Sequence, residues 1–595
     1  MKNPWEKICV KQIREKFRET FRVRFTVFRQ PFVCFPRAEK SFCYVRDFIC
    51  RPLLRFLPYW GTLLFLVLLS AAVMRHEMWR DEIQAWLLAR GAATPWDLLV
   101  NMKYEGHPGL WHLLIWIPAR LWADPAGMQI CHILIASASV FLLLRFAPFP
   151  CVVRILTACG YYFCYEWAVI ARNYAISALL LFAVCVLYRE RWRFFPYIGG
   201  VFFLLCHTNI GSILFTIVMF VLLMIDFAVA YAGHFRGAER YFARCFLGFL
   251  LIAAGIATGI LQIRPPEDSG YAVNWRFEWK YEPFRRSTET LLNAFLPLPP
   301  DRKHFWNSNS VFLSAPKKNS SAATVSGTAV AEAGAVSRFF SHFHLERSQA
   351  PGAAGILLAA LFLVFFFKRP WMGLQFFFCT VALVLFFYVK YGGSWRHHGM
   401  IYLAFLASFW MSYYYDPWRL PWRVPEKILD AADRFRWVWL LPLLCIQIRG
   451  AQIALKNDWN HPFSMAKECA AWVKETYSGE ERAEMIFIGR SGPMSSTLCG
   501  FLGGIPFYYT ERGEFGTYMI WDKARFRSAK KDFFDSVREI SEEKNSRPCL
   551  LILGKALEEG KIPQECRFLR SFSGGIVGDE QYHLYLWTPK KKTDG

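Results

Sequence analysis

Long apolar runs are the feature that most constrains the fold of this chain. The runs near 56 to 74, 128 to 147, 210 to 231 and 371 to 389 approach or exceed the roughly 18 to 20 residues that a helix needs to cross about 30 Å of hydrocarbon. The 595 residues are 54% hydrophobic and 18% aromatic, which is more apolar surface than a soluble protein of this length normally carries. A bilayer is therefore the expected solvent.

Read in order, the apolar runs predict a polytopic α-helical membrane protein with eleven spans. The candidate spans are 57-74, 128-147, 152-170, 174-188, 194-209, 210-231, 245-263, 352-367, 371-389, 398-415 and 436-450. A further stretch, Pro108 to Trp122, is apolar and aromatic but reaches only about 22 Å as a helix. Because Pro118 and Arg120 interrupt it, we expect a helix that lies in the membrane interface.

The net charge of +23 is distributed as on the cytoplasmic flanks of membrane spans. Residues 1-55 hold 14 Lys and Arg against 5 Asp and Glu, which gives 14 − 5 = +9. This distribution argues against a nucleic-acid partner and for a membrane surface. The basic segment precedes the first apolar run and lacks the layout of a signal peptide, so we expect the first span to stay attached as an anchor.

The basic loops predict the orientation of the chain. With Pro108 to Trp122 kept out of the count, five loops on one side carry the basic clusters Arg145 and Arg154; Arg189, Arg191 and Arg193; Arg236, Arg240 and Arg244; Lys368 and Arg369; and Arg419, Arg423, Lys427, Arg434 and Arg436. The positive-inside rule assigns that side to the cytoplasm. The amino terminus is then cytoplasmic and the carboxy-terminal region is outside, in a bacterial inner or plasma membrane.

The expected domains are a basic segment at 1-55, a transmembrane domain at 56-454 and an outer α/β domain at 455-595. Within the membrane part, 75-127 is the first outward loop and 265-350 is a long outward loop with a Ser/Ala/Gly-rich middle, expected to be a disordered linker or a lid. The tail has strand-length runs (MIFIG, PFYY, CLLIL, YHLYLW) between amphipathic stretches. Its cysteines, Cys469, Cys499, Cys549 and Cys566, could pair if the tail lies outside.

One constellation carries chemistry. The first span is followed by MWRDEIQAWLLARGAATPWDLLVNMKYEGHPGLWHLLIW, in which the pair Asp81-Glu82 precedes His107-Pro108 by about 25 residues. This pattern resembles the first outward loop of the GT-C superfamily, in the branch containing protein O-mannosyltransferases and the aminoarabinose transferases that modify lipid A. The resemblance is specific over roughly 55 to 130, diffuse to about 450 and does not cover the tail. One departure is Gly109 where the family has a second proline.

The acidic pair Asp81-Glu82 is the candidate catalytic feature, because its chemistry agrees with the resemblance. Carboxylates beside a membrane span are expensive to keep near lipid unless they have partners or a function. Sugar transfer to a hydroxyl needs a general base within hydrogen-bond reach of that hydroxyl, and Asp81 is our candidate. Glu82 would orient Asp81, contact the acceptor or help to hold a metal. The competing interpretation is a solvated acidic start to a helix after Trp79.

The resemblance implies a polyprenyl-phosphate-linked sugar donor, whose departing phosphate needs cations or donors at the membrane surface. The predicted topology puts Arg172, Arg396 and His397 on the side of Asp81, and arginine suits phosphate because its fork donates two parallel bonds. The candidate supporting residues are Glu105, His107, Tyr174 and His207. Asp81, Glu82, Glu105 and His107 could bind a divalent cation, although no D-x-D spacing occurs. Snorkelling at the interface is the alternative for the arginines.

These features predict an extracytoplasmic glycosyltransferase that moves a sugar from a polyprenyl-phosphate donor to a lipid, glycan or protein acceptor. The resemblance implies inversion at the anomeric carbon. A multi-pass transporter or lipid flippase is the alternative, because many spans and intramembrane charges suit both classes. A transporter should show internal repeats, and the sequence has none that we find. A non-catalytic assembly subunit is a third possibility, but such a subunit should lack Asp81.

Overall fold

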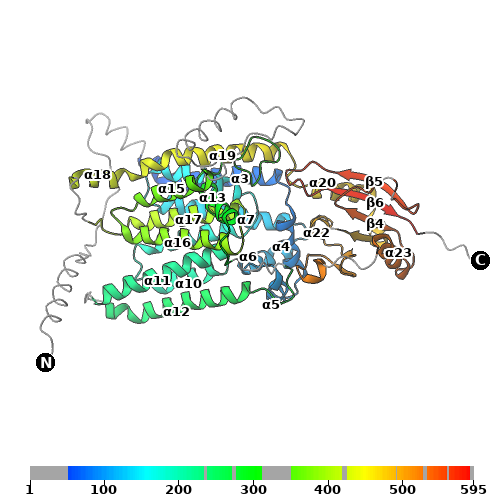
Figure 1. Ribbon diagram of the computed structural model, residues 1–595, viewed down its shortest axis with the longest axis horizontal. Coiled ribbons are helices and arrows are strands. Elements are labelled where there is room, and N and C mark those ends of the chain that lie inside the picture. The colour runs from blue at the N-terminus through cyan, green and yellow to red at the C-terminus, as the bar shows by residue number, and fades with distance from the viewer. Residues whose placement is uncertain are drawn as a thin grey trace, which may run out of the picture.

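The computed structural model describes residues 51–232, 238–270, 277–310, 350–418, 425–490, 492–526, 532–558, 560 and 562–589. Apolar helices form a bundle, and a smaller α/β region follows at one end of it (Figure 1). Among the described residues, six helices are long and apolar enough to cross a bilayer. Leu64 and Leu68 on the first of them are 60% and 62% exposed, as expected of side chains that face lipid. The chain is a multi-pass membrane protein.

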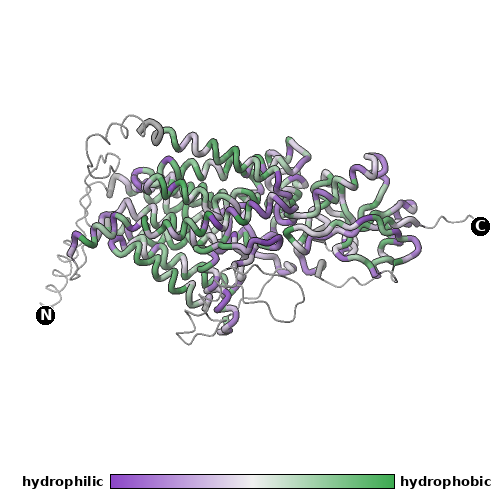
Figure 2. The backbone as a smooth tube through the Cα atoms, turned by 90° about the horizontal axis from the view of Figure 1, so that it is seen from above, coloured by the Kyte–Doolittle hydropathy of each residue, from purple (hydrophilic) through white to green (hydrophobic). Residues whose placement is uncertain are grey.

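The bundle is built from helices that mostly coincide with the apolar runs, apart from the amphipathic α13. They are α3 (Arg51–Arg75), α7 (Ala126–Phe146), α8 (Cys151–Ala158), α9 (Tyr174–Tyr188), α10 (Phe195–Cys206), α11 (Ile210–Ala232), α12 (Ala238–Ile263), α13 (Tyr281–Phe295), α15 (Ala350–Val364), α16 (Pro370–Val389), α17 (Trp395–Ser412) and α19 (Leu440–Asn460). Figure 2 shows that apolar residues dominate these helices, whereas the carboxy-terminal region is more mixed.

The predicted count of eleven spans is not confirmed. Helices α9, α10 and α15 are apolar but only 15, 12 and 15 residues long, short of the roughly 18 to 20 that a span needs. The run 152-170 is not one helix: α8 ends at Ala158, a π-helical turn (Tyr162–Glu166) follows, and the chain then forms turns up to α9. Apolar composition locates these segments, but it does not show where a helix breaks.

The long loop at 265-350 contains a helix that was not predicted. The amphipathic α13 packs against α15, α16 and α17, and Phe295 at its end stacks on Phe362 with ring centroids 4.2 Å apart. The Ser/Ala/Gly-rich middle of the loop lies outside the described residues, as does almost all of the basic segment 1-55. Of the predicted outward loop, the part next to the bundle is therefore structured.

The carboxy-terminal region contains the small sheet that its strand-length runs predict. Its elements are α20 (Ala466–Thr476), α21 (Gly479–Glu484), β1 (Ile486–Gly489), α22 (Gly492–Phe501), β2 (Phe507–Tyr509), β3 (Glu514–Gly516), α23 (Phe533–Glu543), β4 (Cys549–Leu553), β5 (Cys566–Phe572) and β6 (Tyr582–Trp587). The strand order is β3-β2-β1-β4-β6-β5, with β1 parallel to β2 and β4 and the other pairs antiparallel. Cys469, Cys499, Cys549 and Cys566 are all free.

Three short helices lie between the bundle and the sheet: α4 (Arg80–Gly91), α5 (Pro95–Asn101) and α6 (Leu110–Leu121) (Figure 1). Twelve residues make α6 about 18 Å long, which is too short to span a bilayer, and its position in the membrane interface stays a prediction. Helix α22 packs so closely on α4 that a Cβ at Gly500 would lie 2.3 Å from Ile83 Cγ2. Helix α4 therefore shares one core with the sheet.

Polar contacts also join α4 to the carboxy-terminal region. The Arg80 backbone N–H donates to Glu580 Oε1 at 2.9 Å, and the Arg80 guanidinium donates to Asp579 Oδ2 at 2.7 Å. Gln84 Nε2 donates to the Met519 carbonyl at 2.7 Å. Asp81 and the carboxy-terminal region therefore share one end of the bundle, while α18 (Glu426–Phe435) lies at the other end (Figure 1).

Which end faces the cytoplasm stays a prediction, and cysteine labelling tests it. We expect Glu542→Cys in α23 to react with a membrane-impermeant maleimide in intact cells, and Lys427→Cys in α18 to react only after permeabilisation. The parent protein, with its native cysteines, gives the background. The reverse pattern would mean that the positive-inside assignment is wrong.

The contact between α4 and the carboxy-terminal region should depend on pH through Glu580. Burial raises the pKa of this carboxyl from its usual 4.5 to about 7, although Ser464 and Arg80 donate hydrogen bonds to it. A raised pKa in the folded state means that the stabilisation is fully present below about 4.5 and is lost as the pH rises through 7. The melting temperature of wild type should therefore fall relative to Glu580→Gln between pH 5 and 8. A constant difference would contradict this.

Candidate active site

The two carboxylates of the acidic pair, Asp81 and Glu82, differ in exposure. Both stand in the first turn of α4, and four residues separate the end of α3 from the start of α4. Asp81 remains 27% exposed, whereas Glu82 is completely buried. The first can be reached by a substrate and the second cannot, so the pair divides into one exposed and one internal group.

Two arginines converge on Asp81. Arg396 Nη2 donates to Asp81 Oδ2 at 2.9 Å, and Arg172 Nη1 lies 3.8 Å from the same oxygen. Arg172 also donates to the backbone carbonyl of Asp81. Both arginine side chains are about nine-tenths buried. The structure thus brings Arg172 and Arg396, which are 91 and 315 positions from Asp81 in the sequence, into contact with it. The result is a half-buried site in which two positive charges face one carboxylate.

Local structure explains where each arginine stands. Arg172 lies in the turn between the π-helical segment and α9, and Arg396 lies in the first turn of α17. The guanidinium of Arg396 packs over the rings of Trp79 and Trp306, at 5.4 and 5.7 Å from their centroids. Such cation–π contacts hold a cation in one place while leaving its N–H groups free to donate.

Glu82 is satisfied internally. Its Oε1 accepts the Ala171 backbone N–H at 2.6 Å, and its Oε2 contacts Trp79 N–H at 3.2 Å and His76 Nε2 at 3.1 Å. With both oxygens occupied and no exposed surface, Glu82 is placed to orient its neighbours. Contact with an acceptor, the second of the roles left open by the sequence, would require these bonds to break.

His107 and Glu105 lie beside Asp81, Arg172 and Arg396, which we name the arginine-carboxylate cluster. Burial, with help from Arg172 and Arg396, lowers the pKa of His107 to about 3, so its ring is neutral and Nε2 accepts from Arg172 Nη2 at 3.1 Å. Burial raises the pKa of Glu105 to about 7, against the effect of the 2.8 Å hydrogen bond from Gln84 Nε2. Glu105 can therefore exchange a proton near neutral pH.

The remaining predicted residues divide into two groups. Tyr174 and His397 are at the rim of the cluster, with ring centroids 5.6 Å apart, and His397 also caps the start of α17 through Ser394. His207 is not part of the cluster. Its Nδ1 bonds the Phe203 carbonyl at 2.8 Å and its Nε2 bonds Thr258 Oγ1 at 3.1 Å, as in a structural helix cap.

Sequence reasoning missed several residues that build the site. Trp306, from the long outward loop, covers Arg396 and donates through Nε1 to Glu166 at 3.1 Å. The next residue, Asn307, accepts the backbone N–H of Trp395 at 3.1 Å and so holds the start of α17. Aromatic and amide side chains inside a polar loop have no periodic signal that would mark them in the sequence.

The residues suggested for a divalent cation do not fit one in this arrangement. Asp81 and His107 both bond to arginine, and Glu82 is occupied by donors. Among the described residues, no group of three or more His, Cys, Asp or Glu side chains is placed to hold a metal. With two guanidinium groups, the cluster instead suits an anionic ligand such as a phosphate.

Comparison with known proteins gives one structural similarity. The chain is similar to ArnT from Cupriavidus metallidurans in the apo state, with 11% sequence identity, a TM-score of 0.44, and coverage of 88% of this chain and 97% of ArnT. A likeness at this level assigns no activity to the chain. No protein-family model matches the sequence, and no curated protein matches it.

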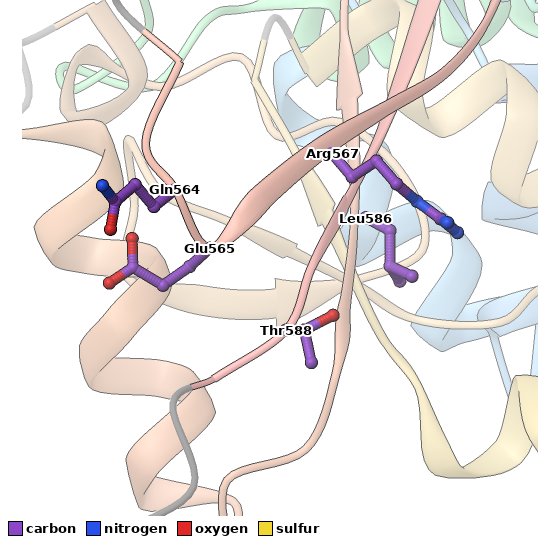
Figure 3. A pocket seen from close by; sticks show the side chains of 5 residues that line it. All are labelled: Gln564, Glu565, Arg567, Leu586 and Thr588. Atoms are coloured by element: carbon purple, nitrogen blue, oxygen red, sulfur yellow. The ribbon is translucent and has the colours of Figure 1, made fainter.

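An open hollow lies elsewhere, beside β5 and β6 in the carboxy-terminal region (Figure 3). Its lining consists of Gln564, Glu565, Arg567, Leu586 and Thr588. It contains none of the residues around Asp81. It is therefore separate from the arginine-carboxylate cluster.

Proposed function

We propose that this protein is a membrane glycosyltransferase that takes a sugar from a polyprenyl-phosphate donor and transfers it to a hydroxyl of an extracytoplasmic acceptor. The observation that carries the proposal is the convergence of Asp81, Arg172 and Arg396 at one end of the apolar bundle. Transfer of a sugar from a lipid phosphate requires a base for the acceptor hydroxyl and cations for the departing phosphate, both at the edge of the membrane. The resemblance of the Asp81 to Pro108 segment to the GT-C superfamily agrees with this.

In the proposed reaction, Asp81 takes the proton of the acceptor hydroxyl, whose oxygen attacks the anomeric carbon in line with the leaving group. The bond between that carbon and the phosphate oxygen breaks, and the oxygen leaves with the electron pair as polyprenyl phosphate. Arg172 and Arg396 stabilise the charge that develops on it, and His397 and Tyr174 border the same region. The resemblance implies inversion at the anomeric carbon.

The ion pairs of Asp81 suggest an order of events. Arg396 occupies the Asp81 oxygen that would accept the proton. A donor phosphate offers both arginines a stronger, bidentate partner, so its arrival draws them away and frees the carboxylate. The base therefore becomes available only when the donor is present. Glu82 orients the residues next to Asp81, and Glu105 and His107 lie beside the arginine-carboxylate cluster.

The finer parts of the proposal follow the topology and the resemblance. The amino terminus lies in the cytoplasm, the site and the 455-595 region lie outside, and the host membrane is a bacterial inner membrane. The acceptor is a lipid, a glycan or a protein, and the partners include the membrane but no nucleic acid. The donor sugar is left open between hexoses and pentoses.

A transporter or lipid flippase is the second candidate, and one observation favours it. The 152-170 run is discontinuous, and broken helices line the binding sites of many transporters. However, this break leads into Arg172 at the cluster, where non-helical backbone also suits a catalytic site. The convergence of a carboxylate and two arginines at this point supports transfer from a lipid phosphate.

Mass spectrometry of surface glycans in cells with and without the gene tests the proposal. We expect one sugar modification to disappear when the gene is deleted and to return with wild type but not with Asp81→Asn. Recovery with both versions would argue for the transporter.

A further inference from the structure

A buried chain of charged groups lies behind the arginine-carboxylate cluster. His76 Nδ1 lies 2.9 Å from Asp458 Oδ2, and His76 Nε2 lies 3.1 Å from Glu82 Oε2. Each of the three residues exposes at most 5% of its surface. Asp458 comes from the end of α19, His76 follows α3, and Glu82 is in α4. This chain, which we name the Asp458-His76-Glu82 relay, joins three elements.

Both ring nitrogens of His76 face a carboxylate, and only an imidazolium can donate from both at once. Burial by itself lowers the pKa of His76, but Asp458 and Glu82 outweigh burial and raise the pKa to about 10. The relay therefore carries one positive charge between two negative charges. Buried ion pairs contribute little net stability, so a function in fixing geometry is the better reason for this arrangement.

The far end of the relay reaches the backbone next to Arg172. Glu82 Oε1 accepts the Ala171 N–H at 2.6 Å, and Arg172 is the next residue. Residues 167 to 173 form turns between the π-helical segment and α9, so no regular helix holds Ala171. The position of Arg172 therefore depends on Glu82, and the position of Glu82 depends on His76.

We propose that the Asp458-His76-Glu82 relay is the positioning element that sets Arg172 against Asp81. The inference rests on the proposed function and deepens it. Through Asp458, the relay connects the end of α19 to Arg172, which would contact the donor phosphate. The three residues act through Arg172 and do not touch the substrate.

Asp458→Asn tests the relay because it keeps the size of the side chain and removes one charge. We expect kcat for transfer to fall by about 10- to 100-fold, with KM for the donor changed much less, since a displaced arginine acts mainly on leaving-group charge. Asp458→Glu should recover part of the loss. The matched control is Asp301→Asn, which removes a carboxylate that binds the same helix end through Lys456 and Asn457.

Hydrogen exchange gives a readout that does not need activity. In detergent micelles, Asp458→Asn should speed exchange of the Ala171 amide and leave the bundle helices protected, while Asp301→Asn should change neither. Unchanged exchange and unchanged kcat in Asp458→Asn would overturn the relay. Faster exchange at Ala171 in a protein whose wild type transfers no sugar would keep the relay and reject the proposed function. If Asp458→Asn does not fold, His76→Gln replaces it with the same expectations.

Discussion

Asp81→Asn is expected to lower the rate of sugar transfer by at least about 10²- to 10⁴-fold, the range that general-base catalysis supplies. The substitution keeps the size of the side chain, and its amide oxygen can still accept from Arg396, so folding and donor binding should survive. The measurement is transfer from a synthetic polyprenyl-phosphate donor in detergent micelles at equal concentrations of folded protein.

Two variants control for this result. Asp124→Asn changes a carboxylate in the same outward segment that only caps α7, and it should transfer at the wild-type rate. Glu82→Gln should be less severe than Asp81→Asn, because Glu82 acts through its neighbours. If Asp81→Asn transfers sugar at the wild-type rate, the assignment of the base is wrong. Partial recovery on adding a divalent cation would point to a metal site instead.

Arg396→Ala is expected to raise the barrier to transfer by roughly 2.7 to 4 kcal/mol, as for the loss of one preorganised donor, which corresponds to about 10²- to 10³-fold in kcat. Arg396→Lys should recover only part of this, because an ammonium lacks the planar fork and packs less well over Trp79 and Trp306. The measurement is kcat in the same micelle assay.

Arg286→Ala is the matched control for the arginine. Arg286 is an exposed residue of α13 that pairs with Glu282, away from the cluster, and its removal should leave kcat unchanged. Full activity in Arg396→Ala would mean that Arg396 serves only to pack between the two tryptophans. Binding of the donor phosphate would then depend on Arg172 alone of the two arginines.

The sequence allowed much of the architecture to be predicted, because apolar runs long enough for a bilayer leave few alternatives. It could not show where the 152-170 run breaks, since the π-helical turn (Tyr162–Glu166) is itself mostly aromatic and so continues the apolar run. The amphipathic α13 was hidden in a polar loop, and β5 was missed because Arg567 and Arg570 interrupt its apolar residues. Composition therefore located membrane segments better than it located their ends.

The site was partly predictable for a similar reason. Asp81, Arg172 and Arg396 were placed on one side by the topology, and the structure brings them into contact. His207 was placed there too, but its ring bonds within its own helix and to Thr258. His76 and Asp458 were missed because they are 382 residues apart and neither belongs to a motif. Long-range pairing of single residues leaves no pattern in one sequence.

The most direct test of the central claim is to follow a labelled donor in proteoliposomes that contain the purified protein. A panel of hexose and pentose polyprenyl phosphates would be supplied, with a lipid and glycan extract of the producing cells as acceptor. The account predicts that one donor yields free polyprenyl phosphate and a labelled product with wild type, and that Asp81→Asn yields neither. A donor that stays intact but crosses the bilayer with both proteins would contradict it and make the protein a flippase.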